Sequence, residues 1–217
     1  THDDGHVDVF VGGRALVQGN RVNEIVLTRN AANNDYMDLE WSSDGAPVRV
    51  ASGEIGGLLG QRDVDLPARL ADLNALVTQV MADVNAVHAA GFGADGVTTG
   101  LDFFSGTGIA DIAVNGALAA DLRLLAAASS AASPGDGSGA TAIAALQRAT
   151  NLTGGSETYG AFYNGIVTRL GVSVRDAQGI SRAQTLTISH LEQLRQSISG
   201  VNLDEEMVNM VQFQRGY

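Results

Sequence analysis

The sequence contains no cysteine and no lysine, and each absence removes a class of chemistry. Without cysteine there is no disulfide framework and no thiolate nucleophile. Without lysine there is no Walker-type phosphate loop, because that motif requires a lysine beside its glycines. All 13 basic residues are arginines, set against 24 acidic residues, for a net charge of −11. No cluster of arginines is visible, so the charge argues against nucleic acid as a partner.

Aromatic residues and long hydrophobic runs are also scarce. Aromatic side chains make up 5% of the chain, and although 45% of the residues are hydrophobic, no run approaches the roughly 20 apolar residues of a membrane span. The first six residues are polar and acidic, unlike a signal peptide. A chain of 217 residues can bury a core, and we expect one elongated unit plus a piece of a second.

The glycine motif at residues 91–96 spells G-x-G-x-x-G. A dinucleotide site needs this motif after a strand and at the start of a helix. Here it follows a predicted helix and leads into a loop, so we interpret it as a helix stop with a turn.

The histidines do not form a recognisable metal or catalytic motif. His2 and His6 have i,i+4 spacing, but Gly5 lies between them near the chain terminus, which disfavours a fixed site. His88 and His190 have no ligand partner four residues on, so we expect packed or surface side chains. We therefore predict no catalytic, cofactor-binding or metal-binding residue, and no enzymatic activity.

Residues 1–52 alternate in the manner of strands. Apolar residues recur at every second position in four short segments, and turn residues separate them. We predict a small antiparallel β unit, with strands around Val7–Val11, Ile25–Leu27, Met37–Trp41 and Val48–Val50.

A long helix is predicted from about Gly53 to Ala90. Its apolar residues follow a 3-4 spacing that requires a partner helix along its length: Leu59, Leu66, Leu70, Leu73, Val77, Val80, Val84 and Val87. Pro67 lies inside the span, so either a short first turn ends near Asp65 or the helix is kinked there.

Residues 91–155 are rich in loops and small side chains. We predict a strand at 109–114, an alanine-rich helix near 118–128, a linker at 133–139 and a short helix from 140 to about 151. We expect this loop-rich stretch to let the chain return on itself.

The longest helical stretch is predicted at 156–199, with a second apolar seam between Tyr163 and Val201. Three glycines within it, Gly165, Gly171 and Gly179, each cost about 1 kcal/mol relative to alanine, and we expect bends or close neighbours there. We predict that the 59–87 seam packs antiparallel against the 163–201 seam.

The last residues predict another helix. Gly200 ends the preceding helix, Asn202 caps the new one, and the acidic residues 204–206 favour the positive end of its dipole rather than forming a metal site. An apolar stripe begins and is cut off at the end of the chain without a stop, so we expect a fragment whose missing partner helix matters. The candidate contact residues are Leu203, Met207, Met210, Val211 and Tyr217.

Three blocks of sequence resemble one known family. Gly200–Glu206 with the closing Gln-Phe-Gln-Arg-Gly-Tyr, residues 52–92, and Phe103-Phe104 followed by Ile112–Asn115 occur in the order found in flagellar axial proteins. The resemblance is greatest to the hook-associated protein 1 family, the first hook–filament junction proteins, and covers most of residues 50–217.

The resemblance implies a fold that is mainly α with a small β part: an elongated antiparallel bundle of long helices plus a small antiparallel β unit. It implies an outer domain that includes residues 1–52, a rod-like inner domain at 53–200 with the insert 91–155, and the start of a terminal coiled coil at 201–217. It further implies an extracellular structural subunit of the bacterial flagellum, exported without a cleaved signal peptide. Its partners would be hook protein, the second junction protein, further copies of itself and an export chaperone for the C-terminal helix.

Two alternatives stay open. The chain resembles other axial proteins in part, namely hook protein, the second junction protein or flagellin. An extracellular binding module, with its pocket in the loop-rich region 91–155, is the alternative from a different class. For this chain alone we expect a monomer, since the helices that complete an axial protein are lacking.

Overall fold

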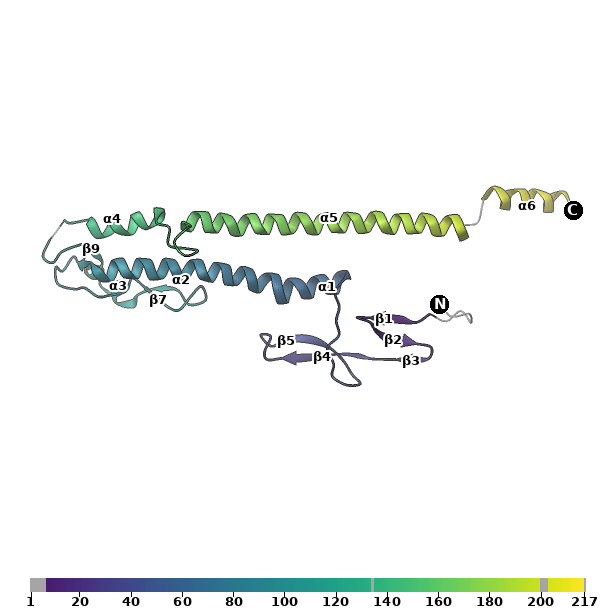
Figure 1. Ribbon diagram of the computed structural model, residues 1–217, viewed down its shortest axis with the longest axis horizontal. Helices are drawn as coiled ribbons and strands as arrows, with labels where there is room; N and C mark the ends of the chain where they lie inside the picture. Colours follow the sequence, from purple (N-terminus) through teal and green to yellow (C-terminus); the bar gives the residue numbers. More distant parts are fainter. Residues whose placement is uncertain (1–6, 134, 200–202, 217) are drawn as a thin grey trace. The chain divides into compact units, whose positions relative to one another are not determined.

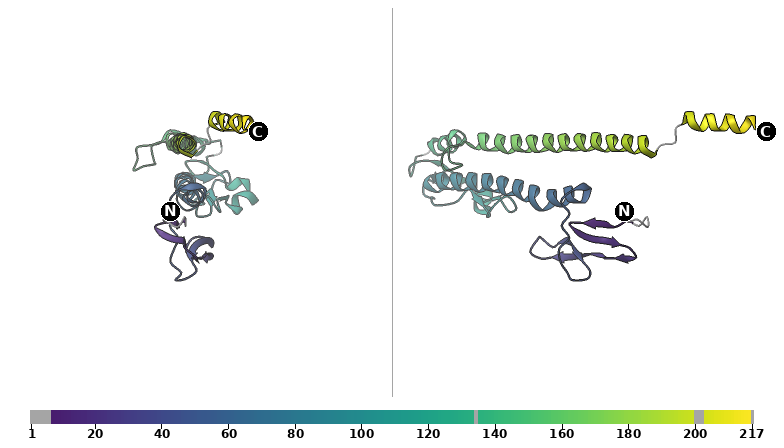
Figure 2. Two further views of the ribbon diagram at one scale, coloured as in Figure 1. Left: turned by 90° about the vertical axis from the view of Figure 1, so that its right-hand side faces the viewer. Right: turned by 45° about the vertical axis from the view of Figure 1, so that its right-hand side comes forward.

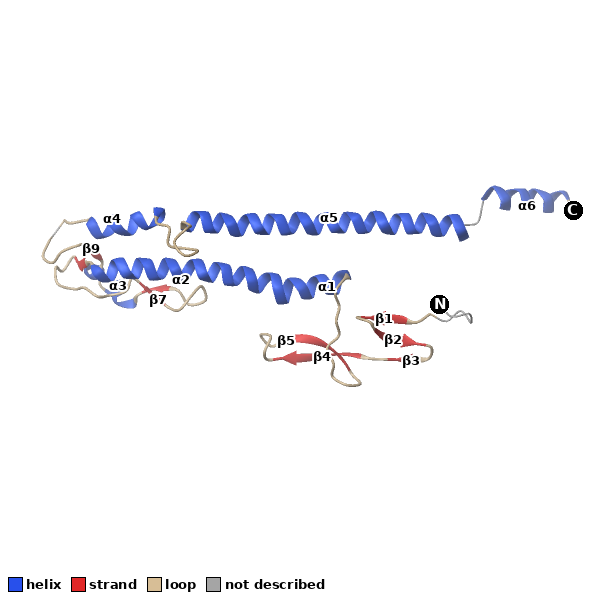
Figure 3. Cartoon of the chain, viewed as in Figure 1, coloured by secondary structure: helices blue, strands red, loops and turns tan. Residues whose placement is uncertain are grey.

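The computed structural model describes residues 7–133, 135–199 and 203–216. Within-chain contacts divide the chain into two units, residues 1–147 and residues 148–217. Helices predominate, with small antiparallel sheets in the first unit (Figure 3). The predicted fold class, mainly α with a small β part, is confirmed.

The described part of the chain begins with antiparallel strands. Strands were predicted around Val7–Val11, Ile25–Leu27 and Met37–Trp41, whereas those at residues 14–18 and 21–22 were not predicted. Strands β1 (Val9–Val11), β2 (Arg14–Gln18) and β3 (Arg21–Val22) form one sheet, and β4 (Ile25–Asn30) and β5 (Tyr36–Trp41) form a hairpin (Figure 1). The hairpin pairs Ile25 with Trp41 and Asn30 with Tyr36 at its two ends. Trp41 is buried, and the Arg14 guanidinium lies 4.8 Å from the centre of its ring.

The strand predicted around Val48 and Val50 is wrong. A single bridge joins Glu40 to Pro47, and the Val48 amide donates to the Leu39 carbonyl at 2.8 Å. Proline has no amide hydrogen, so the ladder cannot continue through Pro47. Val48 is nevertheless buried, which explains its apolar character.

The predicted helix at 53–90 is present in three consecutive segments. Helix α1 (Gly53–Gly60) leads into a π-helical turn, η1 (Gln61–Asp65), and α2 (Leu66–Ala90) follows. In the wider turn the Leu66 amide donates to the Gln61 carbonyl. Pro67 cannot donate a hydrogen bond, and its ring would clash with a carbonyl four residues earlier in an α-helix. The π turn therefore accommodates Pro67, at the place where the sequence predicted a break or a kink in the helix.

Four short strands, one short helix and one 3₁₀ turn follow α2 in the first unit: β6 (Phe92–Gly93), β7 (Phe104–Ser105), β8 (Ala113–Val114), α3 (Gly116–Ala120), η2 (Leu122–Leu124) and β9 (Ala126–Ala128). Strand β6 pairs with β9, and β7 with β8. Helix α4 (Ser138–Ala145) and the turn η3 (Leu146–Arg148) come next. The short helix predicted from 140 is thus present, beginning two residues earlier.

Two predictions in this stretch need correction. The strand predicted at 109–114 is limited to Ala113–Val114. The helix predicted at 118–128 ends at Ala120, because Asp121 turns its carboxylate back onto the Arg123 amide and so starts a separate 3₁₀ turn. Residues 126–128 then form β9.

The second unit contains the longest helix, α5 (Tyr159–Ser199), and α6 (Leu203–Arg215). Among the residues of this unit whose burial is described, Leu152 and Ile166 are the buried large apolar side chains. Helix α5 runs through Gly171 and Gly179 without interruption, and the right-hand view of Figure 2 shows it unbroken. Apart from the adjoining backbone of α5 itself, no atom lies within 4 Å of a Cβ built at either glycine, so the predicted bends and close neighbours are not seen at these two positions. Gly200 and Asn202, the predicted stop and cap, lie outside the described residues. The predicted pairing of the two seams stays a prediction.

Candidate subunit-contact surface

Helix α6 exposes the predicted contact stripe. Met207 is 56% exposed, Met210 57% and Val211 44%. Leu203 is the first residue of α6, and Tyr217 lies outside the described residues. Sequence reasoning missed Phe213, which is 80% exposed and lies beside this stripe. An aromatic residue between two glutamines, in a chain with few aromatics, was the signal that could have identified it.

Helix α5 exposes a much longer apolar surface. Every residue from 167 to 197 is exposed. The large apolar side chains among them are Val167, Leu170, Val172, Val174, Ile180, Leu186, Ile188, Leu191 and Leu194. A helix is marginal in water unless an apolar face is packed. Contiguous exposed apolar surface of this kind marks sites where another protein binds.

The first unit, in contrast, anchors its loops on α2. His88 is 1% exposed. Its Nδ1–H donates to the Leu101 carbonyl at 2.7 Å, and its Nε2 accepts the Ala126 amide at 3.0 Å. Both ring nitrogens are thus bonded to backbone from the segment after α2, and the ring also packs edge-on against Phe103. The expectation of a packed histidine is confirmed.

Two asparagines on the same side of α2 hold further loop backbone. The Asn85 side chain accepts the Phe104 amide at 2.8 Å and donates to the Phe104 carbonyl at 3.0 Å, as a neighbouring strand would. The Asn74 oxygen accepts the Ile109 amide at 2.9 Å. Gly108 packs so closely on Asn74 that a Cβ there would lie 2.2 Å from its oxygen, which explains the glycine. These anchors, which sequence reasoning missed, make α2 the support of the loop-rich segment.

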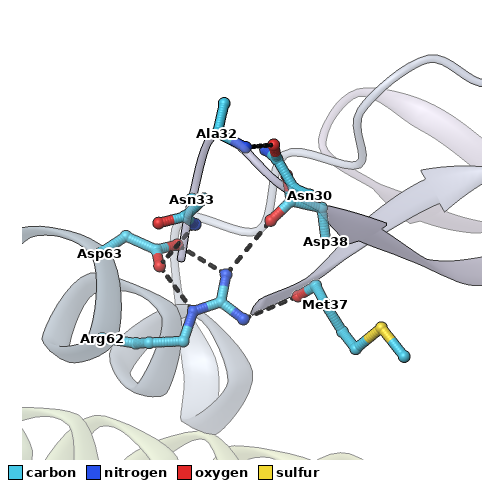
Figure 4. Close-up of polar contacts among 7 residues, drawn as sticks. All are labelled: Asn30, Ala32, Asn33, Met37, Asp38, Arg62 and Asp63. Atoms are coloured by element: carbon cyan, nitrogen blue, oxygen red, sulfur yellow. Dashed lines mark hydrogen bonds and ion pairs between the residues drawn. The ribbon is translucent and has the colours of Figure 1, made fainter. Parts of the chain in front are cut away.

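Arg62, in the π turn, joins the β hairpin to the long helix (Figure 4). Its guanidinium donates to the Met37 carbonyl at 2.7 Å and to Asp63 at 2.9 Å, and lies 5.3 Å from the Tyr36 ring centre. A longer contact of 3.4 Å reaches Asp38. Hydrogen bonds from Arg62 hold the pKa of Asp63 below its usual range. The residue extends from helix to hairpin, so it fixes the attachment of the two within the first unit.

The loop segment also contains a hollow of about 710 Å³ beside β6 and β9. Two carboxylates line it, Asp95 and Asp136, and both are hydrogen-bonded within their own loops. Asp95 accepts the amides of Val97 and Thr98. Asp136 accepts those of Ser129 and Ser138, and such bonds lower its pKa to about 2. These carboxylates stabilise turns.

The glycine motif has the turn role that the sequence predicted. Gly91 follows the last residue of α2, Gly93 lies in β6, and Gly96 has φ +75°, a conformation that favours glycine. Among the residues that the structure describes, no group of three histidine or carboxylate side chains is arranged to hold a metal ion. No helix in the described ranges is long and apolar enough to cross a membrane.

Comparison with known proteins finds two family models that match parts of this chain. Residues 1–104 match the model of the flagellar hook-associated protein FlgK helical domain. Residues 192–217, which include α6, match that of the flagellar basal body rod FlgEFG protein C-terminal region. The two matches thus cover the β unit with α2, and the exposed C-terminal stripe.

Proteins named flagellar hook-associated protein 1 in several bacteria are similar to this chain over different lengths. Flagellar hook-associated protein 1 of Bacillus subtilis (strain 168) is 29% identical over 169 residues, which is 73% of this chain and 33% of that protein. The same-named protein of Escherichia coli (strain K12) is 32% identical over 97 residues, 45% of this chain and 18% of that protein. That of Salmonella typhimurium is 34% identical over 68 residues, 31% of this chain and 12% of that protein. The chain therefore spans a third or less of these relatives.

In its two family matches, the chain is similar to structural axial proteins of the bacterial flagellum. Within that class, the chain is similar to the flagellar hook-associated protein 1 family.

Proposed function

We propose that this chain is part of a subunit that joins hook to filament in the extracellular bacterial flagellum and is required for filament assembly. The observation that carries the proposal is the exposure of every residue from 167 to 197 on α5, continued by the exposed stripe of α6. A helix of this length gains its stability from packing rather than from propensity alone. Its apolar seam is therefore a surface for neighbouring helices in an assembly.

The proposed role assigns a task to each region. Residues 1–52 belong to an outer domain, 53–200 form the rod-like inner domain, and 201–217 begin a terminal coiled coil. Leu203, Met207, Met210, Val211 and Tyr217 are the proposed contact residues of that coiled coil. Hook protein and the second junction protein are the proposed neighbours, with an export chaperone on the C-terminal helix before assembly. The work is mechanical, with no reaction catalysed.

Genetic complementation tests the proposal. The gene that encodes this chain is expressed in a strain lacking hook-associated protein 1, and hook-attached filaments are counted by electron microscopy. We expect filaments to return with the unaltered gene. The paired substitution Leu191→Ser/Leu194→Ser in the α5 seam should abolish them, because it makes the packing face polar. The matched control on the same helix, Gln193→Ala/Gln196→Ala, should leave filaments unchanged. Failure of the unaltered gene, or filaments with the seam variant, would contradict the proposal.

A further inference from the structure

The charge of the chain is unevenly distributed between its two units. Residues 1–147 contain 18 acidic residues and 7 arginines, whereas residues 148–217 contain 6 of each. The whole net charge of −11 therefore belongs to the first unit. Helix α5 alone has four arginines and two acidic residues, so it is a basic helix in an acidic chain.

A second row of residues lies on the side of α5 away from the seam. It follows the same 3-4 spacing, displaced by two positions, which rotates it about 200° around the helix. The row consists of Val172, Arg175, Gly179, Arg182 and Leu186. All five are exposed. Within the described part of the chain, neither Arg175 nor Arg182 forms a hydrogen bond or an ion pair. One neighbouring helix on the seam leaves this row uncovered, because it covers one side of α5 only.

A row of opposite charge runs along α2. It also has 3-4 spacing, and it consists of Asp65, Ala68, Asp72, Ala75, Gln79 and Ala82. The three alanines and Asp65 are exposed, whereas Asp72 is half-buried and forms an ion pair with Arg69 at 3.2 Å, which Arg175 would join. Asp65 and Asp72 are seven residues apart, as are Arg175 and Arg182, so both pairs are separated by about 10.5 Å along their helices. The alanines leave room between the carboxylates for larger side chains.

We propose that the Arg175–Arg182 row of α5 docks on the Asp65–Asp72 row of α2 in a second copy of this chain. The helices run antiparallel, with Arg175 on Asp72, Gly179 on Ala68 and Arg182 on Asp65. Val172 then rests on Ala75. A parallel arrangement would instead place Val172 on Arg62, whose guanidinium is engaged by the β hairpin. Apart from the adjoining backbone of α5, no atom lies within 4 Å of a Cβ built at Gly179, so a neighbouring helix can approach closely there.

The proposal deepens the proposed function, on which it rests, by naming one contact between copies. Charge and shape both contribute: opposite charges at matched spacing fix the register, and Val172 on Ala75 supplies buried apolar surface. Two exposed ion pairs contribute little on their own. The contact is therefore weak between isolated chains and is strengthened by repetition in an assembly.

Disulfide trapping tests the contact, since the natural chain has no cysteine to interfere. One copy has Gly179→Cys and the other, labelled with ¹⁵N, has Ala68→Cys. Mixed chains are oxidised mildly, and mass spectrometry measures the heterodimer. We expect the heterodimer to exceed, on the order of tenfold, that from a control pair in which Ser181→Cys, on another side of α5, replaces Gly179→Cys.

Charge reversal gives the decisive comparison. Arg175→Glu/Arg182→Glu should reduce the trapped heterodimer to the control level, and Asp65→Arg/Asp72→Arg on the other copy should restore it. Arg21→Glu/Arg49→Glu, the same change in net charge within the β-rich segment, should have no effect. A heterodimer yield at the control level would overturn the proposal. So would a third variant, with Gly179→Cys and Ala68→Cys in the same chain, that forms its disulfide exclusively within one chain. Normal complementation alongside that result would leave the proposed function standing.

Discussion

Helices α2 and α5 are both long and both have a regular apolar seam, yet the surroundings of the second half of α2 differ from those of α5. In α2, Met81 and His88 are buried and the segment that follows the helix is hydrogen-bonded to it. In α5, no residue after Ile166 is buried up to residue 197. The difference shows that the same 3-4 spacing of apolar residues can serve two purposes. The first helix organises a core of its own chain, and the second presents a surface to neighbours.

The largest expected effect comes from removing the anchor that distinguishes α2. His88→Ala leaves the Leu101 carbonyl and the Ala126 amide without their partner and opens a cavity, so the free energy of unfolding should fall by about 3 kcal/mol. Urea unfolding followed by circular dichroism measures it. The control His190→Ala, at an exposed site on α5, should change stability by less than about 0.5 kcal/mol. Equal midpoints for the two variants would remove the distinction between the helices.

A smaller effect is expected where the β hairpin joins the long helix. Arg62→Ala removes the bond to the Met37 carbonyl and the contact with the Tyr36 ring, at a cost of about 1 kcal/mol. Hydrogen exchange should become faster in β4 and β5 and stay unchanged in the second half of α2. Arg62→Lys should recover part of the protection from hydrogen exchange, because lysine keeps the positive charge but lacks the planar guanidinium with its several donors. Uniform loss of protection throughout the first unit would show that Arg62 does not act locally.

The smallest effect is expected when low pH protonates two carboxylates, Asp121 and Asp136, in the segment that follows α2. Hydrogen bonds from Arg123 lower the pKa of Asp121 to about 2, and those from Ser138 and Ser129 lower the pKa of Asp136 to about 2. A lowered pKa in the folded state stabilises it above the ordinary value near 3.8, and this contribution is lost as the pH falls toward 2. Amide exchange at Arg123, Ser129 and Ser138, corrected for intrinsic rates, should therefore quicken between pH 4 and pH 2. Asp121→Asn should abolish the pH dependence at Arg123, and its persistence would argue against this carboxylate as the cause.

The sequence predicted the helical framework because long, regular apolar spacing is a strong signal. The seams of α2 and α5, the discontinuity before Pro67 and the strands β1, β4 and β5 follow from local patterns, whereas β2 and β3 were not predicted. The error at residues 126–128 has a different origin. Alanines favour helices, but here pairing with Phe92 and the bond from the Ala126 amide to His88 determine a strand. Such tertiary contacts override propensity and are not visible locally.

The candidate surface was predicted in part. The stripe at Met207, Met210 and Val211 could be recognised from spacing, whereas the anchors Asn74, Asn85 and His88 were not identified. Their spacing places them along one side of α2, and polar residues repeated on a helix that also has an apolar seam are a signal that could have found them. What they bind is backbone from distant residues, which side-chain patterns do not encode.

Hydrogen exchange of the isolated chain tests most directly the claim that α2 is packed by its own chain and α5 is left for neighbours. We predict that amides in the second half of α2, around Asn85 and His88, exchange slowly, and that those of residues 170–194 exchange orders of magnitude faster. Equal protection of the two helices in the isolated chain would contradict the account.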